Sequence, residues 1–171
     1  MKSRLFLTAL GLWLGAGLAS GLTAGSALAL DAHVSKDTAG APAAVWAAIG
    51  DFCGIAAWHP AVAKCEISAK DGATYRTLTL KDGAKLLEKQ TAFDAKAMTY
   101  SYTIEDGPLP VANYKSTLKV VAKDAAAKGG GSTIDWSGTF DAKGAPDADA
   151  IKTITGIYAG GIDALVAKTS R

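Results

Sequence analysis

The sequence predicts an α+β domain in which one long C-terminal helix packs against a seven-stranded antiparallel sheet, with two short helices after the first strand. Between Ala63 and Phe140 apolar residues recur at every second position, the period of a half-buried strand. Gly and Asp-Gly turns interrupt this stretch and favour short hairpins, which join antiparallel neighbours. One long amphipathic stretch follows Pro146, and no other predicted element is long enough to cover a sheet face.

Residues 1–29 have the three parts of a secretory signal peptide. Lys2 and Arg4 precede an apolar run, and small residues end the segment at Ala29. We expect cleavage after Ala29, which leaves residues 30–171 as a single domain that is periplasmic or secreted and not inserted in the membrane. An uncleaved anchor is the alternative, but glycines dilute the run, and a spanning helix needs about 20 strongly apolar residues.

The first predicted strand covers residues 30–35, and two short helices follow it. Pro42 suits the first turn of a helix that continues over residues 43–49. A second short helical turn is expected over residues 52–57.

Six further strands are predicted from the period-two alternation and its turns. Asp71-Gly72, Asp82-Gly83 and Asp106-Gly107 are hairpin signals, and Gly129-Gly130-Gly131 suits the last turn. The six strands cover residues 64–69, 74–81, 85–93, 97–104, 114–122 and 132–140.

The long helix is expected to begin near residues 146–148 and to end near Lys168. Its apolar stripe, at three- and four-residue spacings, consists of Ile151, Ile154, Ile157, Tyr158, Ile162 and Leu165. Gly156, Gly160 and Gly161 each cost about 1 kcal/mol relative to Ala inside a helix. We therefore expect either close approach to the sheet or room for a ligand to explain them.

The charge balance excludes several partners. The chain has 18 Lys and Arg against 16 Asp and Glu, and two of the cations lie in the predicted leader, so the domain is neutral. A neutral domain lacks the basic surface that binds nucleic acid. Two histidines without a nearby Cys, His or Asp cluster predict no bound metal, and no nucleotide-binding motif is present, so no cofactor is expected.

Cys53 and Cys65 are the two cysteines of the chain. Export allows a disulfide between them. Their spacing does not show whether the Cα atoms lie within the required distance of about 7 Å, so a disulfide and two buried thiols both remain open.

The order of the predicted elements is similar to the helix-grip fold of START-type lipid-transfer proteins and the birch pollen allergen. The chain resembles the polyketide cyclase/dehydrase-like branch of the SRPBCC superfamily over essentially the whole domain. The residues that carry the resemblance are 51–54 (DFCG), 58–62 (WHPAV), 76–80 (RTLTL), Glu88, 107–111 (GPLPV), Tyr114 and Trp136.

This resemblance implies a hydrophobic ligand, apolar or aromatic, between the sheet and the C-terminal helix. Members of the family include lipid and apolar-ligand carriers as well as cyclases, so a cyclase-like enzyme is the alternative. Some exported members resemble accessory proteins of periplasmic methanol oxidation, which leaves open a role beside an oxidoreductase with an unidentified protein partner.

Arg76 and Glu88 are predicted to point into the cavity, because they share the strand face of Leu78 and Leu86. With a three-residue loop over residues 82–84, Leu78 would lie opposite Glu88, and Arg76 would lie diagonal to it. An ion pair is expected, since isolated buried charges are strongly disfavoured. We prefer a structural pair, and the alternative is a pair that transfers protons or orients a ligand carboxylate or carbonyl.

His59 is the candidate acid or base, and Pro60 places it on an extended loop at the cavity rim. The alternative is a histidine hydrogen-bonded to backbone, because no catalytic partner is identifiable by sequence. Aromatic residues on the inward strand faces are either core or pocket lining. The full set of candidate ligand-binding residues is Trp58, His59, Arg76, Leu78, Glu88, Tyr100, Tyr102, Tyr114, Ser116, Trp136 and Tyr158.

Overall fold

The computed structural model describes residues 28–123 and 131–170. The predicted signal peptide up to residue 27 lies outside the described residues. Of the predicted turn at residues 129–131, only Gly131 is described, and its φ of 98° is a left-handed conformation that glycine adopts readily.

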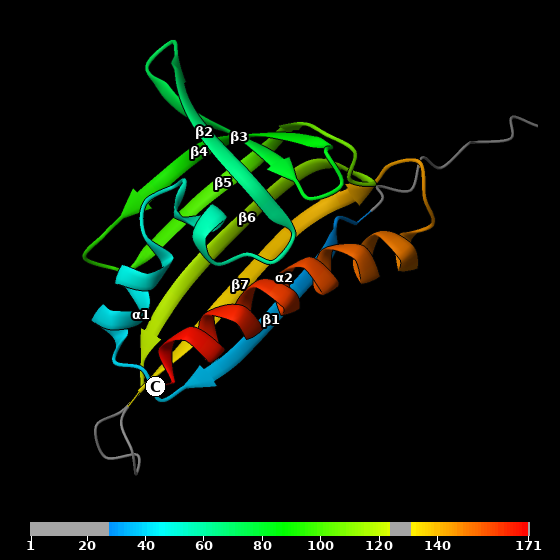
Figure 1. Ribbon diagram of the computed structural model, residues 1–171. Coiled ribbons are helices and arrows are strands. Elements are labelled where there is room, and N and C mark those ends of the chain that lie inside the picture. Colours follow the sequence, from blue (N-terminus) through cyan, green and yellow to red (C-terminus); the bar gives the residue numbers. More distant parts are fainter. Residues whose placement is uncertain (1–27, 124–130, 171) are drawn as a thin grey trace, which may run out of the picture.

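Seven antiparallel strands form one sheet in the order β1-β7-β6-β5-β4-β3-β2 (Figure 1). Consecutive strands from β2 to β7 are neighbours, as short hairpins require. The β2–β3 hairpin extends beyond the rest of the sheet. The strand bounds are β1 Leu30–Thr38, β2 Val62–Lys70, β3 Ala73–Leu80, β4 Lys85–Asp94, β5 Thr99–Asp106, β6 Val111–Ala122 and β7 Ser132–Ala142.

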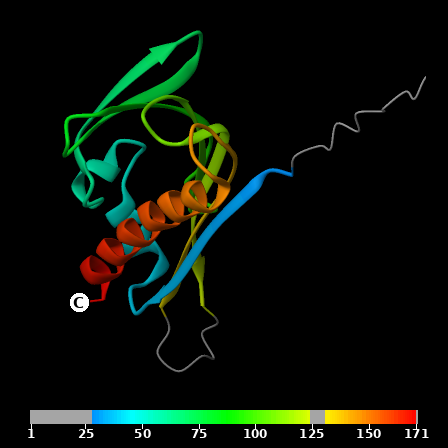
Figure 2. The same ribbon diagram turned by 90° about the vertical axis from the view of Figure 1, so that its right-hand side faces the viewer.

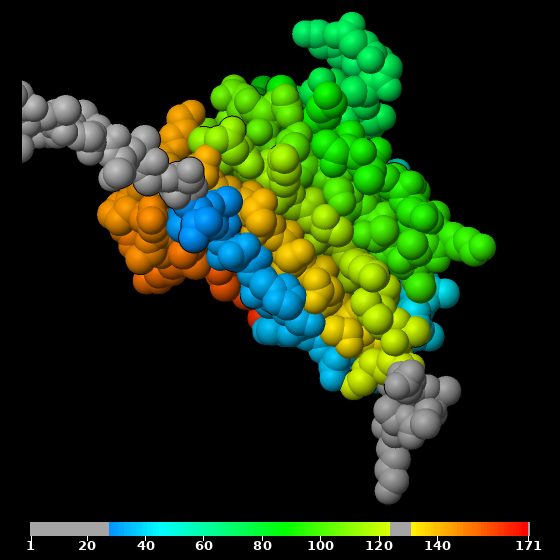
Figure 3. Space-filling view, turned by 180° about the vertical axis from the view of Figure 1, so that it is seen from behind, coloured from blue at the N-terminus to red at the C-terminus, as the bar shows by residue number. Residues whose placement is uncertain are grey.

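One long helix, α2 (Asp147–Thr169), lies across the concave face of the sheet (Figure 2). The opposite face shows β1, β7 and β6 side by side, uncovered by the described helices (Figure 3). Among the described helices only α2 is long and apolar enough to span a membrane, but its apolar stripe packs in the core. The α+β helix-grip architecture is confirmed.

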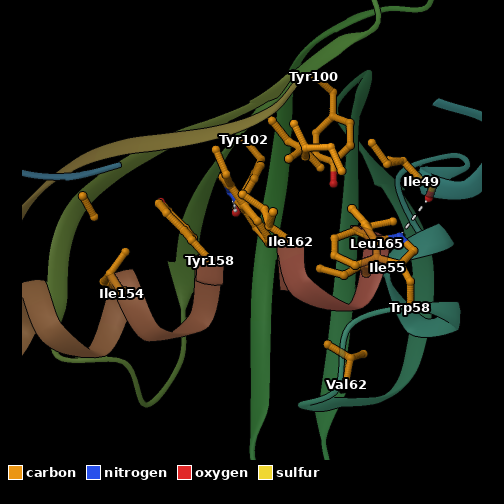
Figure 4. Packing of buried hydrophobic residues seen from close by; sticks show 14 of the residues in the cluster. Ile49, Ile55, Trp58, Val62, Tyr100, Tyr102, Ile154, Tyr158, Ile162 and Leu165 are labelled. Atoms are coloured by element: carbon orange, nitrogen blue, oxygen red, sulfur yellow. Dashed lines mark hydrogen bonds between the residues drawn. The ribbon is translucent and has the colours of Figure 1, made fainter. Parts of the chain in front are cut away.

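Two short helices follow β1, as the sequence predicts. The first, α1 (Pro42–Ile49), has proline in its first turn, and the second is the 3₁₀ helix η1 (Gly54–Ala57). Trp58, the residue after η1, links the two helices, because its indole Nε1 donates a hydrogen bond of 3.0 Å to the carbonyl of Ile49 at the end of α1 (Figure 4).

The predicted register of the β3–β4 hairpin is wrong by two residues. Arg76 lies directly opposite Glu88, and Leu78 lies opposite Leu86. The loop has three residues, as expected, but they are residues 81–83 instead of 82–84. Gly83 explains the shift: its φ of 87° places it at the third loop position, where a type I turn is followed by a left-handed residue.

The core lies between the concave sheet face and α2 (Figure 4). From the helix it takes Ala150, Ile154, Tyr158, Gly161, Ile162 and Leu165, while the predicted Ile151 and Ile157 are half-buried. A Cβ atom on Gly161 would lie 2.7 Å from His59 and 2.8 Å from Trp136, whereas one on Gly156 would meet nothing within 4 Å. Close approach therefore accounts for Gly161 but not for Gly156.

Candidate functional site

Arg76 and Glu88 form a buried ion pair on neighbouring strands. Arg76 is 0% exposed and Glu88 3%. The Arg76 Nε atom donates to Glu88 Oε2 at 2.5 Å, and Nη1 donates to the backbone carbonyl of Phe52. The Phe52 ring centroid is 4.0 Å from the guanidinium carbon, so an aromatic face covers the cation. The Nη2 atom is buried without a hydrogen-bond partner among the described residues.

The electrostatics of this pair keep the guanidinium charged. Burial lowers the pKa of Arg76, but the opposing charge of Glu88 and nearby tyrosines leave it above its ordinary value. Burial raises the pKa of the Glu88 carboxyl, and the Arg76 charge offsets part of that rise. The pair is therefore a charge-assisted contact held in a low-dielectric interior.

His59 is buried between α2 and Trp136, and both of its ring nitrogens are hydrogen-bonded to backbone. The Ala61 N–H donates to Nδ1 at 3.2 Å, which leaves the proton on Nε2, 3.1 Å from the Ile157 carbonyl that accepts it. Burial lowers the pKa of His59, and the charge of Arg76 lowers it further, although the bond to Ile157 acts in the opposite direction. His59 is a neutral imidazole that joins the loop before β2 to the helix.

A chain of buried hydroxyl groups crosses the interior from β5 to β7. The Tyr158 hydroxyl donates to Ser116 Oγ at 3.0 Å, and Ser116 donates to the Ser137 carbonyl at 2.8 Å. The oxygen of Tyr114 lies 2.5 Å from that of Tyr158 and 3.4 Å from that of Tyr102.

Trp136 also belongs to this network, and burial keeps its tyrosines protonated. The Trp136 indole Nε1 lies 3.1 Å from the Tyr102 oxygen and 3.0 Å from Ser116 Oγ, and it donates to both. Burial raises the pKa of Tyr158 to about 12 and those of Tyr102 and Tyr114 well above their usual value. All three tyrosines therefore keep their protons at neutral pH.

A partly enclosed, mainly apolar cavity of about 70 Å³ lies between the sheet and α2. Six predicted ligand residues line it: His59, Leu78, Glu88, Tyr102, Tyr114 and Trp136. The other five predicted residues, Trp58, Arg76, Tyr100, Ser116 and Tyr158, do not belong to this lining. They are buried, and a hydrogen bond or ring contact joins each of them to a residue of the lining.

Nine further lining residues are not among the predicted ligand-binding residues, namely Ile55, Ala61, Val62, Leu80, Leu86, Ile104, Leu109, Ile154 and Ile157. Leu80 and Ile104 carry the same inward alternation as Leu78 and Tyr102, so their strands already contained the signal. Leu109 lies in a loop, where no periodicity exists to indicate its direction.

A surface groove of about 600 Å³ lies outside the cavity, between α2 and the loop after η1. His59, Ala61 and Ile157 line both spaces and so form the wall between them. Gly156 and Gly160 also line the groove, and their missing side chains leave it open. The groove therefore meets the cavity wall at these three shared residues.

A disulfide joins Cys53 to Cys65, with a Cα–Cα distance of 5.5 Å. It fixes the residue before η1 to the edge strand β2. Because Phe52 directly precedes Cys53, the disulfide also holds the carbonyl and the ring that contact Arg76. Within the described residues, no group of three or more His, Cys, Asp or Glu side chains could hold a metal ion.

Comparison with known proteins gives a match over nearly all of the described chain. Residues 29–169 match the family model described as polyketide cyclase/dehydrase and lipid transport. No curated protein matches the chain.

Several solved structures are similar. XoxI from Bacillus cereus is 32% identical, with a TM-score of 0.72 over 81% of this chain and 94% of that one. A protein from Thermobifida fusca is 26% identical, with a TM-score of 0.68 over 81% and 92% of the two chains. The Zhui aromatase/cyclase from a Streptomyces species is 14% identical, with a TM-score of 0.65 over 84% and 95%, and it shares the fold alone.

Proposed function

The chain belongs to the polyketide cyclase/dehydrase and lipid transport family, and from this we propose that it binds a small apolar or aromatic molecule between the sheet and α2. The observation that carries the proposal is the cavity between the sheet and α2, whose walls are mostly Leu, Ile, Val and aromatic side chains with one carboxylate. Apolar walls with a few fixed polar groups are the usual composition of a small-molecule site.

The volume of the cavity limits what enters without rearrangement. A cavity of about 70 Å³ is smaller than the roughly 300–1,000 Å³ of typical ligand pockets. A ligand the size of a single aromatic ring therefore requires lining side chains to move. We expect Ile157 and the loop at residues 59–61 to move when a ligand enters, because they separate the cavity from the outer groove.

Binding is favoured over acid–base catalysis by the state of His59. A catalytic imidazole needs one nitrogen free to exchange a proton with its substrate. In His59 the Ala61 N–H and the Ile157 carbonyl occupy both nitrogens, and the lowered pKa keeps the ring neutral. Its contacts are those of a structural histidine.

Native mass spectrometry of freshly purified protein, followed by extraction of any bound molecule, tests this proposal. Replacing Ile104 with Phe should fill part of the cavity and remove the bound species. Replacing Thr103 with Phe, on the opposite face of the same strand, should leave it bound. Recovery of wild-type protein that is always empty, and that takes up no apolar probe, would contradict the proposal.

We also propose that the protein acts after export, with residues 1–29 removed. The charged start, apolar run and small residues before the cleavage site support this. The disulfide supports it as well, since such bonds persist mainly outside the reducing cytosol. Intact-mass measurement of periplasmic protein should show the loss of Met1 to Ala29, and a full-length mass in the membrane fraction would refute the assignment.

A further inference from the structure

The polar groups that line the cavity differ in what they offer a ligand. Side chains with N–H or O–H groups in the lining are His59, Tyr102, Tyr114 and Trp136. Acceptor groups are the carboxylate of Glu88 and the lone pairs of the tyrosine oxygens. Whether a donor is free for a ligand depends on where each proton already points.

The hydrogen bonds among Tyr102, Tyr114, Ser116 and Tyr158 allow the direction of their hydroxyl protons to be inferred by elimination. Ser116 donates to the Ser137 carbonyl, which cannot donate in return. Tyr158 donates to Ser116, so in its contact with Tyr114 it can only accept. Tyr114 therefore donates to Tyr158, and in turn accepts from Tyr102.

The remaining N–H donors of the lining are also used. The indole N–H of Trp136 is shared between the Tyr102 and Ser116 oxygens. The His59 N–H is bonded to the Ile157 carbonyl. Among the described residues, no side chain of the lining keeps a free donor for a ligand.

An acceptor remains at Glu88. Its bond to Arg76 uses Oε2, and Glu88 itself lines the cavity. Arg76 does not belong to the lining, so the cavity meets the carboxylate and not the guanidinium that balances it. A ligand anion would therefore meet a negative group without a compensating donor.

From this inventory we infer that the cavity selects uncharged ligands that carry a hydroxyl donor, which binds the Glu88 carboxylate, over carbonyl compounds and carboxylates of the same size. The inference rests on the proposed function, because it assumes that the cavity is the binding site. It reverses the ligand chemistry expected for an orienting Arg76–Glu88 pair, since the guanidinium lies behind its partner. The reason is general: a buried polar group without a partner costs more than a hydrogen bond gains.

Two probes with the same number of heavy atoms test the inference on the whole protein. Propan-2-ol carries a hydroxyl donor, whereas acetone has only a carbonyl acceptor, and both are close to the cavity in size. Titration followed by NMR shifts of the Leu78 and Leu86 methyl groups and of the Trp136 indole N–H reports binding in the lining. We expect saturable shifts with propan-2-ol and at least fivefold weaker binding of acetone.

The variant Tyr114→Phe tests the proton directions themselves. It removes the acceptor of the Tyr102 proton, which then becomes a free donor at the cavity. Acetone should gain affinity, and the preference for propan-2-ol should fall to about twofold or less. The matched control is Tyr75→Phe, whose ring lies on the outer sheet face beside Lys89 and should leave the preference unchanged.

The possible outcomes distinguish a failure of this inference from a failure of the proposed function. Equal saturable binding of both probes, or an unchanged preference in Tyr114→Phe, would overturn the inference and leave the cavity as a binding site. Shifts that do not saturate with either probe would overturn both. A preference for acetone in the wild-type protein would show that a free donor exists in the lining, and would also overturn the inference.

Discussion

Removing one member of the Arg76–Glu88 pair should destabilise the fold almost as much as removing both. Because these side chains are 0% and 4% exposed, the variant Glu88→Gln leaves a buried guanidinium without its counter-charge. Breaking a buried pair in this way typically costs about 3–5 kcal/mol. At about 4 °C per kcal/mol for a domain of this size, the melting temperature should fall by about 10–20 °C.

The double variant Arg76→Gln/Glu88→Gln leaves no unpaired charge in the core. Its cost should be close to that of either single variant, which corresponds to a coupling energy of about 3 kcal/mol or more between the two side chains. The assay is urea unfolding of the wild type, the two single variants and the double variant, followed by circular dichroism at neutral pH. The comparison requires that the four proteins unfold with the same m-value.

A matched control is available on the neighbouring strand. Lys64 and Glu66 form an ion pair of 2.9 Å whose side chains are 63% and 56% exposed. Glu66→Gln should leave the unfolding midpoint unchanged, because solvent screens an exposed pair. Additive losses in the Arg76 and Glu88 variants would mean that the two side chains act independently, and would refute the energetic role assigned to their contact.

Three further predictions follow from the geometry. Gly161→Ala should lower the free energy of unfolding by about 1–3 kcal/mol through overpacking. Gly156→Ala, with nothing within 4 Å of the new methyl group, should instead stabilise α2 by up to about 1 kcal/mol, and thermal melts of the two variants compare them directly. Replacing Cys53 and Cys65 by Ser should cost about 3 kcal/mol for a loop with a sequence separation of 12, and a reductant should then have no further effect on the variant. The lowered pKa of His59 means that unfolding takes up a proton below about pH 6.5, so the free energy of unfolding should fall as the pH drops, by at most about 1.4 kcal/mol per pH unit. His59→Gln should reduce this pH dependence in urea unfolding titrations. An unchanged pH dependence would count against a buried neutral imidazole.

The fold could be predicted from the sequence because each element carries its own local signal. The alternation of Arg76 with Leu78 and of Leu86 with Glu88 placed all four side chains on the inward face. The pairing across the hairpin needed the loop conformation as well, and Gly83 at the left-handed position shifted it by two residues. The sheet face on which a side chain lies is set by the alternation within its own strand, whereas the register of two paired strands depends on the turn that joins them.

The site was less predictable, because its contacts join distant parts of the chain. His59 bonds a carbonyl 98 residues away, so its role as a structural histidine depends on where α2 lies. Likewise, Tyr102, Tyr114 and Trp136 were recognised as candidate lining, but the direction of their protons follows from Ser116 and the Ser137 carbonyl. The size of the cavity is set by side-chain packing and has no periodic signature.

The one-way order of the hydroxyl chain also bears on what chemistry the cavity favours. Cyclisation and dehydration of carbonyl compounds pass through enolate-like states whose negative oxygen must be stabilised by donors already in place. Here Tyr102 and Tyr114 line the cavity beside the carboxylate of Glu88, and their hydroxyl groups are already hydrogen-bonded within the network. If the inferred proton directions hold, the lining offers a developing oxyanion no free donor and suits the hydrogen-donating end of an uncharged molecule.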